Sequence, residues 1–145
     1  MNWDKNDHDS MALCVWKEAR GEGQKGMEAV AYVILNRAKA WYSHTNEAVH
    51  AAVYAKNQFT SMSVPTDPEF HLTPHPGDLQ YAYCDTLCAT LLTNADTSEI
   101  NDPTHGAMYY ANLAQSTSGW FFEHIVKDTT HHPLLATIGK QNFYK

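Results

Sequence analysis

The chain of 145 residues has no long run of apolar residues and no excess of positive charge. No segment approaches the roughly 18 apolar residues of a membrane-spanning helix, so we expect no stable association with a membrane. Ten Lys and Arg residues stand against 16 Asp and Glu residues, a net charge of −6. This acidic balance argues against a nucleic-acid-binding surface, and we expect no nucleic-acid partner.

Cysteine is also scarce, with Cys14, Cys84 and Cys88 as its three occurrences. The number is odd, and Cys84 and Cys88 lie one helical turn apart. This pattern favours buried thiols in a reducing compartment over a disulfide framework. A zinc site would need a second pair of ligands at matching spacing, and none follows the Cys-x-x-x-Cys pair.

Nine histidines raise the question of a metal site. His71 and His75 are four residues apart, but Pro74 between them disfavours a shared helix face, and the adjacent His131 and His132 point in different directions. The His-Glu-x-x-His motif of zinc peptidases is missing. The sequence therefore predicts neither a metal nor any other cofactor.

The first ten residues lack the basic and apolar regions of a secretory signal. The chain also has no internal repeat, no low-complexity tract and no linker rich in Gly or Ser. A length of 145 residues is enough to bury a core without disulfides. We expect residues 1–145 to form a single domain, monomeric and made in the cytoplasm.

Apolar residues at helical spacing predict four helices that carry most of the order. One starts at Asp9 or Ser10 and ends at Gly21, and the others span residues 24–41, 46–55 and 78–93. Residues 58–64 alternate weakly and precede a Pro-rich loop, which predicts a short strand or hairpin. Short β-prone segments at 107–110, 135–138 and 142–144 complete a mainly α, α+β fold.

Two carboxylates, Glu18 and Glu22, flank the end of the first helix, just before the apolar helix over residues 24–41. Burial beside a core favours the protonated form of a carboxylic acid, which suits a general acid. The alternative is a solvated helix end with both side chains exposed. The local pattern leaves both interpretations open.

Five motifs in order carry a resemblance to a known family. They are Glu-Ala-Arg-Gly-Glu at 18–22, Gly26 with Ala-Val-Ala-Tyr-Val-Ile-Leu-Asn-Arg at 29–37, Gln-Phe-Thr at 58–60, Asp-Pro-Thr-His-Gly-Ala-Met-Tyr-Tyr-Ala-Asn at 102–112, and Ile-Gly at 138–139 with Phe-Tyr at 143–144. From about residue 12 to its end, the chain resembles the cell wall hydrolases of the spore cortex-lytic enzyme type.

The resemblance implies a lysozyme-like fold, related to goose lysozyme and the lytic transglycosylases. It further implies that the substrate is bacterial peptidoglycan, cleaved at the β-1,4 bond between N-acetylmuramic acid and N-acetylglucosamine. The family's catalytic glutamate corresponds to Glu18. Residues 1–145 would then be a catalytic domain.

Most glycosidases use two carboxyl groups about 5 to 9.5 Å apart. Glu22 is the possible second carboxylate nearest to Glu18, although a structural pairing with Arg20 or Arg37 suits it better. Asp67, Glu69 and Asp102 are further candidates in loops or turns. A lytic transglycosylase needs one glutamate, which acts first as acid and then as base, and we favour this route. A hydrolytic muramidase, with a water held by Thr60 or Ser61, is the alternative.

Sugar binding calls for flat apolar surfaces with a few placed polar groups. Tyr109, Tyr110 and Asn112 supply both, and Gln58 and Thr60 are expected to bind substrate or to hold Glu18. The alternatives are ordinary core packing for the tyrosines and a closed turn for the other pair. The aromatic residues 120–122 are expected to belong mainly to the core.

A short chain with no export signal fits a bacteriolytic bacteriophage endolysin. Such an enzyme is made in the host cytoplasm and reaches the wall after a pore-forming partner permeabilises the membrane. Two alternatives are a bacterial wall-remodelling enzyme with a signal outside this sequence, and a non-catalytic peptidoglycan-binding module.

Overall fold

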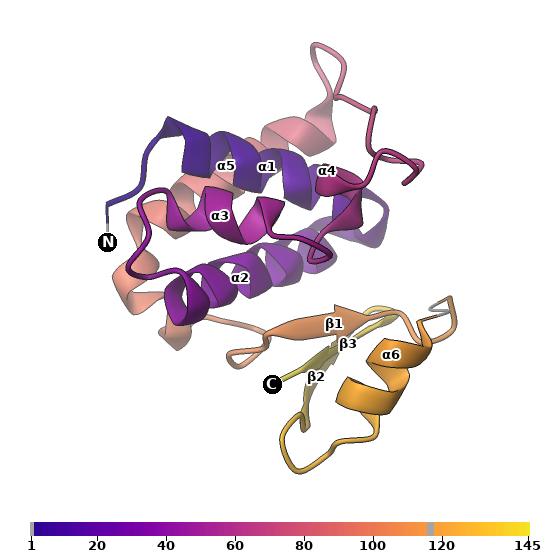
Figure 1. Ribbon diagram of the computed structural model, residues 1–145. Coiled ribbons are helices and arrows are strands. Elements are labelled where there is room, and N and C mark those ends of the chain that lie inside the picture. The colour runs from indigo at the N-terminus through magenta and orange to yellow at the C-terminus, as the bar shows by residue number, and fades with distance from the viewer. Residues whose placement is uncertain (1, 116–117) are drawn as a thin grey trace.

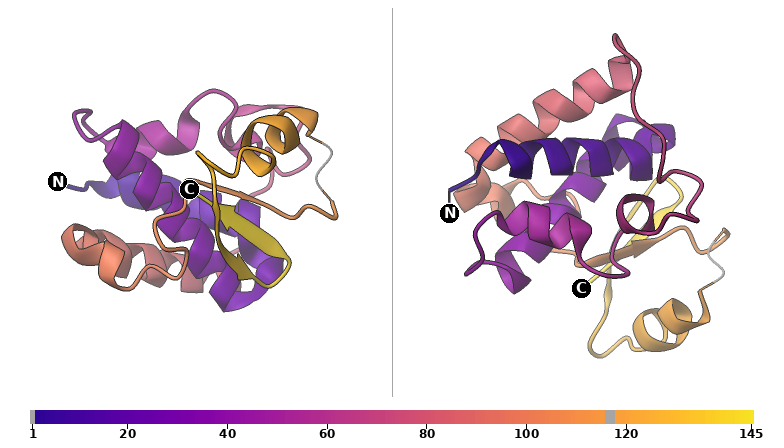
Figure 2. Two further views of the ribbon diagram at one scale, coloured as in Figure 1. Left: turned by 90° about the horizontal axis from the view of Figure 1, so that it is seen from below. Right: turned by 45° about the horizontal axis from the view of Figure 1, so that its top comes forward.

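A group of α-helices makes up most of the fold, and a small antiparallel sheet lies across one side of the long helix α2 (Figure 1; Figure 2). The computed structural model describes residues 2–115 and 118–145. The helices are α1 (Lys5–Ala19), α2 (Gly23–Trp41), α3 (Ala48–Tyr54), α4 (Thr60–Ser63), α5 (Leu79–Thr93) and α6 (Gly119–Phe121). Shorter helical turns are η1 (Arg20–Glu22), η2 (Ala95–Ile100) and η3 (Phe122–Val126), and the strands are β1 (Tyr109–Ala111), β2 (Leu134–Ile138) and β3 (Gln141–Tyr144).

Helix α2 is buried on two sides, because its apolar residues are not confined to one stripe. Val30 and Ile34 are fully buried in the larger core between α1, α2, α3 and α5. Ala29 and Val33 face a second, smaller core, where they pack against Phe143 of the sheet. The helix therefore fixes the sheet relative to α1.

The sheet has the strand order β1-β3-β2, and both strand pairs are antiparallel. Tyr110 of β1 lies opposite Phe143 of β3, and their rings stack at 5.8 Å between centroids. The β-prone segments expected from the sequence thus form one sheet whose central strand is β3.

Helix α1 begins at Lys5, so the expected start at Asp9 or Ser10 is wrong. Asp4 is the N-cap, and it forms a capping box with Asp7. Residues 5–9 are polar and give no apolar periodicity, whereas a capping box built from two aspartates supplies the start signal instead.

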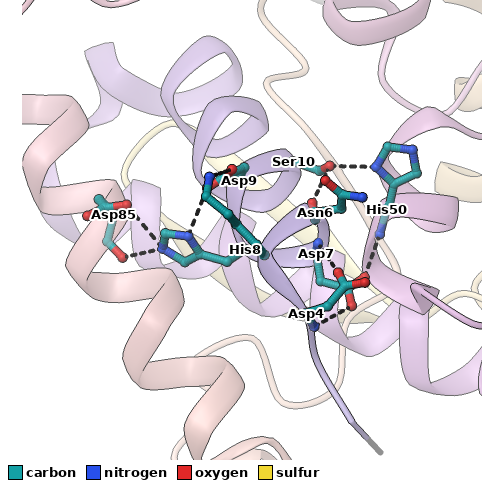
Figure 3. Close-up of polar contacts among 9 residues, drawn as sticks. Asp4, Asn6, Asp7, His8, Asp9, Ser10, His50 and Asp85 are labelled. Carbon is teal, nitrogen blue, oxygen red and sulfur yellow. Dashed lines mark hydrogen bonds and ion pairs between the residues drawn. The ribbon is translucent and has the colours of Figure 1, made fainter.

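The buried Asp7 also fastens α1 to α3 (Figure 3). Its carboxylate accepts hydrogen bonds from the backbone N–H groups of Val49 and His50, each at 3.1 Å, and from that of Asp4 at 3.1 Å. Two of these donors belong to the first turn of α3, which otherwise lacks a side-chain cap. One side chain therefore serves two helix N-termini.

Ser10 and His50 lie beside Asp7 without forming a nucleophilic triad (Figure 3). Ser10 Oγ contacts His50 Nδ1 at 2.8 Å, but its own proton is donated to the Asn6 carbonyl at 2.6 Å. Asp7 binds the backbone N–H of His50 and not its ring. The cluster joins helices and leaves no activated hydroxyl.

The helices expected over residues 24–41 and 78–93 are confirmed as α2 and α5, and Asp78 caps α5 by accepting from Tyr81 N–H at 2.9 Å. The strand or hairpin expected over 58–64 is wrong, because α4 occupies this segment. Phe59 and Met62 are both buried, and their spacing of three residues is helical.

The three cysteines are buried free thiols, as their spacing indicates. Burial raises the pKa of Cys84 to about 11 and holds the pKa values of Cys14 and Cys88 well above their ordinary value. Among residues 2–115 and 118–145, no helix has the length and hydropathy needed to cross a bilayer.

Replacement of Asp7 tests its double role. We expect Asp7→Ala to lower the free energy of unfolding by about 2–4 kcal/mol, because three backbone donors lose a charged acceptor. Asp7→Asn keeps one acceptor oxygen and should lose less. Midpoints of urea denaturation measure both changes. The control, Asp9→Ala, removes a half-exposed carboxylate and should cost about 0.5 kcal/mol or less. Equal losses for Asp7→Ala and Asp9→Ala would contradict the assignment.

Candidate active site

The side chain of Glu18 is held where three elements meet. It lies in the last turn of α1, and its two carboxylate oxygens accept hydrogen bonds from two hydroxyls. Ser61 of α4 donates to Oε2 at 2.7 Å, and Tyr110 of β1 donates to Oε1 at 2.7 Å. Both donors come from segments far away in the sequence, so the carboxylate has a fixed orientation.

Lys17 holds α4 in place next to this carboxylate. It is buried, and its Nζ donates to the carbonyl oxygens of Ser61 at 3.2 Å and Phe70 at 2.7 Å. Burial lowers the pKa of Lys17 from its ordinary value. The lysine thus fixes the backbone of the residue that hydrogen-bonds Glu18.

Tyr110 remains a hydrogen-bond donor over the working pH range of proteins. Burial raises the pKa of its hydroxyl well above the ordinary value, and the neighbouring charge of Glu18 adds to this effect. Its ring is held by the stacking contact with Phe143. The sheet therefore presents a neutral O–H group to Glu18.

Glu18 opens onto a cavity of about 330 Å³. Among the described residues that line it, Glu18 is the one carboxylate and Arg37 the one cation. The full lining is Glu18, Arg37, Asn57, Gln58, Tyr109, Tyr110, Ala111, Ser118, Trp120 and Phe121. It combines flat aromatic surfaces with a few polar groups, as sugar-binding sites do.

Of the aromatic residues 120–122, Trp120 and Phe121 line this cavity. Trp120 is 61% exposed and Phe122 is also exposed, so the expected core position is wrong for both. Phe121 is half-buried and meets Tyr109 edge to face at 6.4 Å between ring centroids. The helical turn α6 thereby carries an exposed indole at the rim.

Four of the residues expected from the sequence come together at the cavity, namely Glu18, Gln58, Tyr109 and Tyr110. Thr60 and Asn112 do not line it. Thr60 is exposed and donates to Asp67 at 2.6 Å, while Asn112 Oδ1 accepts from Ala114 N–H at 3.1 Å. The hydroxyl on Glu18 belongs to Ser61, the residue after Thr60.

Glu22 is exposed on η1 and does not line the cavity. The expected pairing with Arg20 or Arg37 is wrong, since Arg20 forms its ion pair with Glu69. Glu22 instead explains why residue 26 is a glycine, because a Cβ at position 26 would lie 2.5 Å from the Glu22 Cβ. No larger residue fits there without a shift.

The other candidate carboxylates are engaged in local structure. Asp102 is buried and accepts from the Asn36 amide at 2.9 Å, from both N–H and hydroxyl of Thr104 at 2.8 and 2.7 Å, and from Gly106 N–H at 2.9 Å. Asp67 accepts from Thr60 and from the Glu69 backbone. Within the described ranges, no three His, Cys, Asp or Glu side chains are grouped as metal ligands.

Arg37 lines the cavity, although the sequence suggested it only as a structural partner of Glu22. It is 5% exposed, and its Nε–H donates to the Met108 carbonyl at 2.7 Å. Its guanidinium lies 4.8 Å from the Phe59 ring centroid and 5.7 Å from that of Tyr109. Burial lowers the pKa of Arg37 from its ordinary value. Its position at the end of the family motif over 29–37 was the available signal.

A mainly helical fold thus brings one hydrogen-bonded glutamate to a cavity lined by aromatic and polar side chains. Residues 21–144 match the family model described as Cell Wall Hydrolase. The chain belongs to this family of cell wall hydrolases, and its resemblance to the spore cortex-lytic type is confirmed.

Similar proteins include two spore cortex-lytic enzymes. That of Halalkalibacterium halodurans is 33% identical over 138 residues, which are 95% of this chain and 34% of the relative. That of Bacillus cereus is 32% identical over 144 residues, which are 99% of this chain and 46% of the relative. The chain thus spans between a third and a half of the length of these two relatives.

Two solved structures share the fold. The catalytic domain of the germination-specific lytic transglycosylase SleB from Bacillus anthracis aligns with a TM-score of 0.66 at 30% identity, covering 99% of this chain and 98% of that one. The catalytic domain of the Bacillus cereus SleB protein aligns with a TM-score of 0.62 at 30% identity, covering 99% and 93%. The expected mainly helical, lysozyme-like α+β fold is confirmed.

The environment of Tyr110 gives a prediction about stability at high pH. An unfolded tyrosine loses its proton near pH 10.0, whereas the folded protein withholds that proton to higher pH. Above pH 10 this group should therefore remove up to about 1.4 kcal/mol of stability per pH unit. In Tyr110→Phe this contribution is gone, so its stability should fall less steeply than that of the wild type. Guanidinium chloride unfolding at pH 9, 10 and 11 measures both slopes, and parallel slopes would contradict the buried hydroxyl.

Proposed function

We propose that the chain is a peptidoglycan-degrading glycosidase that acts as a lytic transglycosylase on the β-1,4 bond between N-acetylmuramic acid and N-acetylglucosamine. The observation that carries this proposal is the pairing of one carboxylate, Glu18, with two hydroxyl donors on an aromatic cavity. The likeness to a lytic transglycosylase catalytic domain supports the same reaction.

One carboxyl group suffices for this reaction because it works twice. Glu18 first gives its proton to the glycosidic oxygen, and the bond from that oxygen to C1 of the muramic sugar breaks with positive charge developing at C1. The carboxylate then takes the proton of the C6 hydroxyl as O6 bonds to C1. The products are a free 4-hydroxyl on glucosamine and a 1,6-anhydro-muramic end, and no water is consumed.

Ser61 and Tyr110 suit the second half of this cycle. Their hydroxyls donate to both oxygens of Glu18, so they stabilise the carboxylate left after the first proton transfer. They also fix the direction in which the acid faces the cavity. Both are positioning residues for Glu18.

The cavity walls offer the surfaces that a glycan strand needs. Tyr109, Phe121 and the exposed Trp120 supply flat apolar faces for sugar rings. Gln58 and Asn57 are exposed polar residues on the same cavity and can hydrogen-bond acetamido or hydroxyl groups. We assign substrate binding to these residues and to Tyr110, which also lines the cavity, whereas Thr60 and Asn112 lie outside its described lining and receive no part of this role.

A hydrolytic muramidase is the alternative reaction on the same bond. It requires a second carboxylate or a held water across the sugar from Glu18. Glu22, Asp67, Glu69 and Asp102 are exposed or engaged away from the described lining of the cavity, which favours the one-glutamate route.

The biological setting is a separate proposal. The relatives named above are spore cortex-lytic enzymes, which favours a role in bacterial wall lysis. They lend no support to the phage endolysin, with its release from the host cytoplasm, that the sequence suggests. Lysis of a host on expression with a pore-forming protein, but not alone, would be expected of an endolysin.

Replacement of the catalytic carboxyl group tests the reaction. Purified peptidoglycan treated with the wild type should yield 1,6-anhydro-muramic ends by mass spectrometry, and Glu18→Gln should yield none because an amide cannot donate the proton. The control, Glu22→Gln, should still cleave. Reducing muramic ends from the wild type would show hydrolysis, and uncleaved wall in every digest would show a binding module.

Removal of either hydroxyl on Glu18 should slow the reaction. We expect Ser61→Ala and Tyr110→Phe each to lower kcat about 10- to 100-fold with little change in KM, since each removes a charge-assisted hydrogen bond from the catalytic group. The control is Ser63→Ala on the same helix, whose hydroxyl donates to the Phe59 carbonyl at 3.2 Å. Wild-type kcat in Ser61→Ala and Tyr110→Phe would refute their positioning role.

A further inference from the structure

The guanidinium of Arg37 keeps most of its donors unused. The guanidinium has five N–H groups. Among the described residues, only its Nε–H has a hydrogen-bond acceptor, the Met108 carbonyl. Nη1 is buried and has no hydrogen-bond partner in the same set. Arg37 is buried, with an exposed fraction of 5%.

A buried cation with unpaired donors is costly unless something binds to it. Within the described ranges, no Asp or Glu oxygen lies within 4.0 Å of Arg37, although Glu18 lines the same cavity. The aromatic rings around the guanidinium fill its surroundings but accept no in-plane N–H bond. Arg37 and Glu18 line the same cavity, so the unpaired donors belong to a side chain of its wall.

We propose that Arg37 binds the acyl oxygens of the O3-lactyl group of the muramic sugar whose C1 bond Glu18 cleaves. This inference rests on the proposed function. It makes Arg37 a specificity-determining residue that distinguishes N-acetylmuramic acid from N-acetylglucosamine at that position.

The chemistry of the glycan strand selects the lactyl group. The two sugars share the acetamido group and the C6 hydroxyl, and they differ at O3, which is a free hydroxyl in the glucosamine and a lactyl ether in the muramic sugar. It ends in a carboxylate in strands without stem peptides and in an amide carbonyl where a peptide is attached. The planar guanidinium can donate two parallel hydrogen bonds to the two oxygens of a carboxylate. To the single oxygen of an amide it donates one fewer.

The scissile bond and the lactyl group lie on one sugar ring, and Glu18 and Arg37 lie on one cavity. The lactyl group is on the same sugar ring as C1, whose glycosidic oxygen accepts the proton of Glu18. Arg37 and Glu18 line one cavity of about 330 Å³, a volume on the scale of small-molecule sites. A muramic sugar bound there presents its glycosidic oxygen to one charged residue and its O3 substituent to the other.

Binding in the catalytically inactive Glu18→Gln background tests the proposal without turnover. Calorimetry would compare three tetrasaccharides, namely peptide-free alternating glucosamine–muramic acid, the same compound with its lactyl carboxyls reduced to alcohols, and chitotetraose. With Arg37 intact, we expect the first to bind about 10- to 100-fold more tightly than the other two. A peptide-bearing strand should fall between them.

Variants of Arg37 in the same background should abolish this preference. Arg37→Met removes the donors, and Arg37→Lys keeps the charge but not the planar fork, so it should restore part of the preference. Circular dichroism and thermal unfolding verify that each variant is folded. Arg20→Lys is the matched control, because Arg20 pairs with Glu69 outside the cavity and the preference should persist.

Several results would overturn the inference. Equal affinities of the Arg37-intact protein for the three tetrasaccharides would do so without any Arg37 variant. A loss of affinity for chitotetraose as large as that for the muramic compound would assign Arg37 to a group that both sugars share. Failure of the proposed function looks different, since the lactyl preference would persist while the wild type releases no anhydro ends.

Discussion

The position of the Glu18 carboxylate relative to the sheet depends on the two-sided burial of α2. One side of this helix packs into the core that holds α1 and hence Glu18, and the other packs against Phe143 of β3. Because small side chains such as Ala29 face the sheet, the strand layer approaches the helix closely. Tyr110 stacks on Phe143 and reaches Glu18 from that layer. A shift of the sheet along α2 would carry the hydroxyl away.

Polar contacts at the end of α2 set this register. The Asn36 amide donates to Asp102 and to the Ala107 carbonyl at 3.0 Å, and Arg37 donates to the next carbonyl, that of Met108. Asp102 in turn closes the tight turn that precedes β1, where Gly106 adopts a φ of 88°. The family motifs over 29–37 and 102–112 are therefore two halves of one contact.

The sequence predicted the parts of this architecture that follow from local pattern. Helical spacing located α2 and α5, and the family motif identified Glu18, which the structure places on the cavity with Gln58, Tyr109 and Tyr110. The sequence offered Ser61 only as a holder of water and Arg37 only as a partner of Glu22. It missed their contacts with Glu18 and Met108, because these span 43 and 71 residues of chain. The exposure of Trp120 was missed for another reason. A run of aromatic residues indicates burial, yet the turn α6 directs this indole outward.

The order of the strands has a consequence for how the protein folds. Within the described residues, β1 and β2 pair with β3 and not with each other, although β3 follows both in the chain. During synthesis the helices can pack as they emerge, whereas the sheet must wait for its central strand. Until then Tyr110 has no Phe143 to stack on. Of the two donors to Glu18, Tyr110 depends on the sheet and Ser61 of α4 does not. Pairing of β3 with β1 would thus be the step that brings the Tyr110 hydroxyl to Glu18.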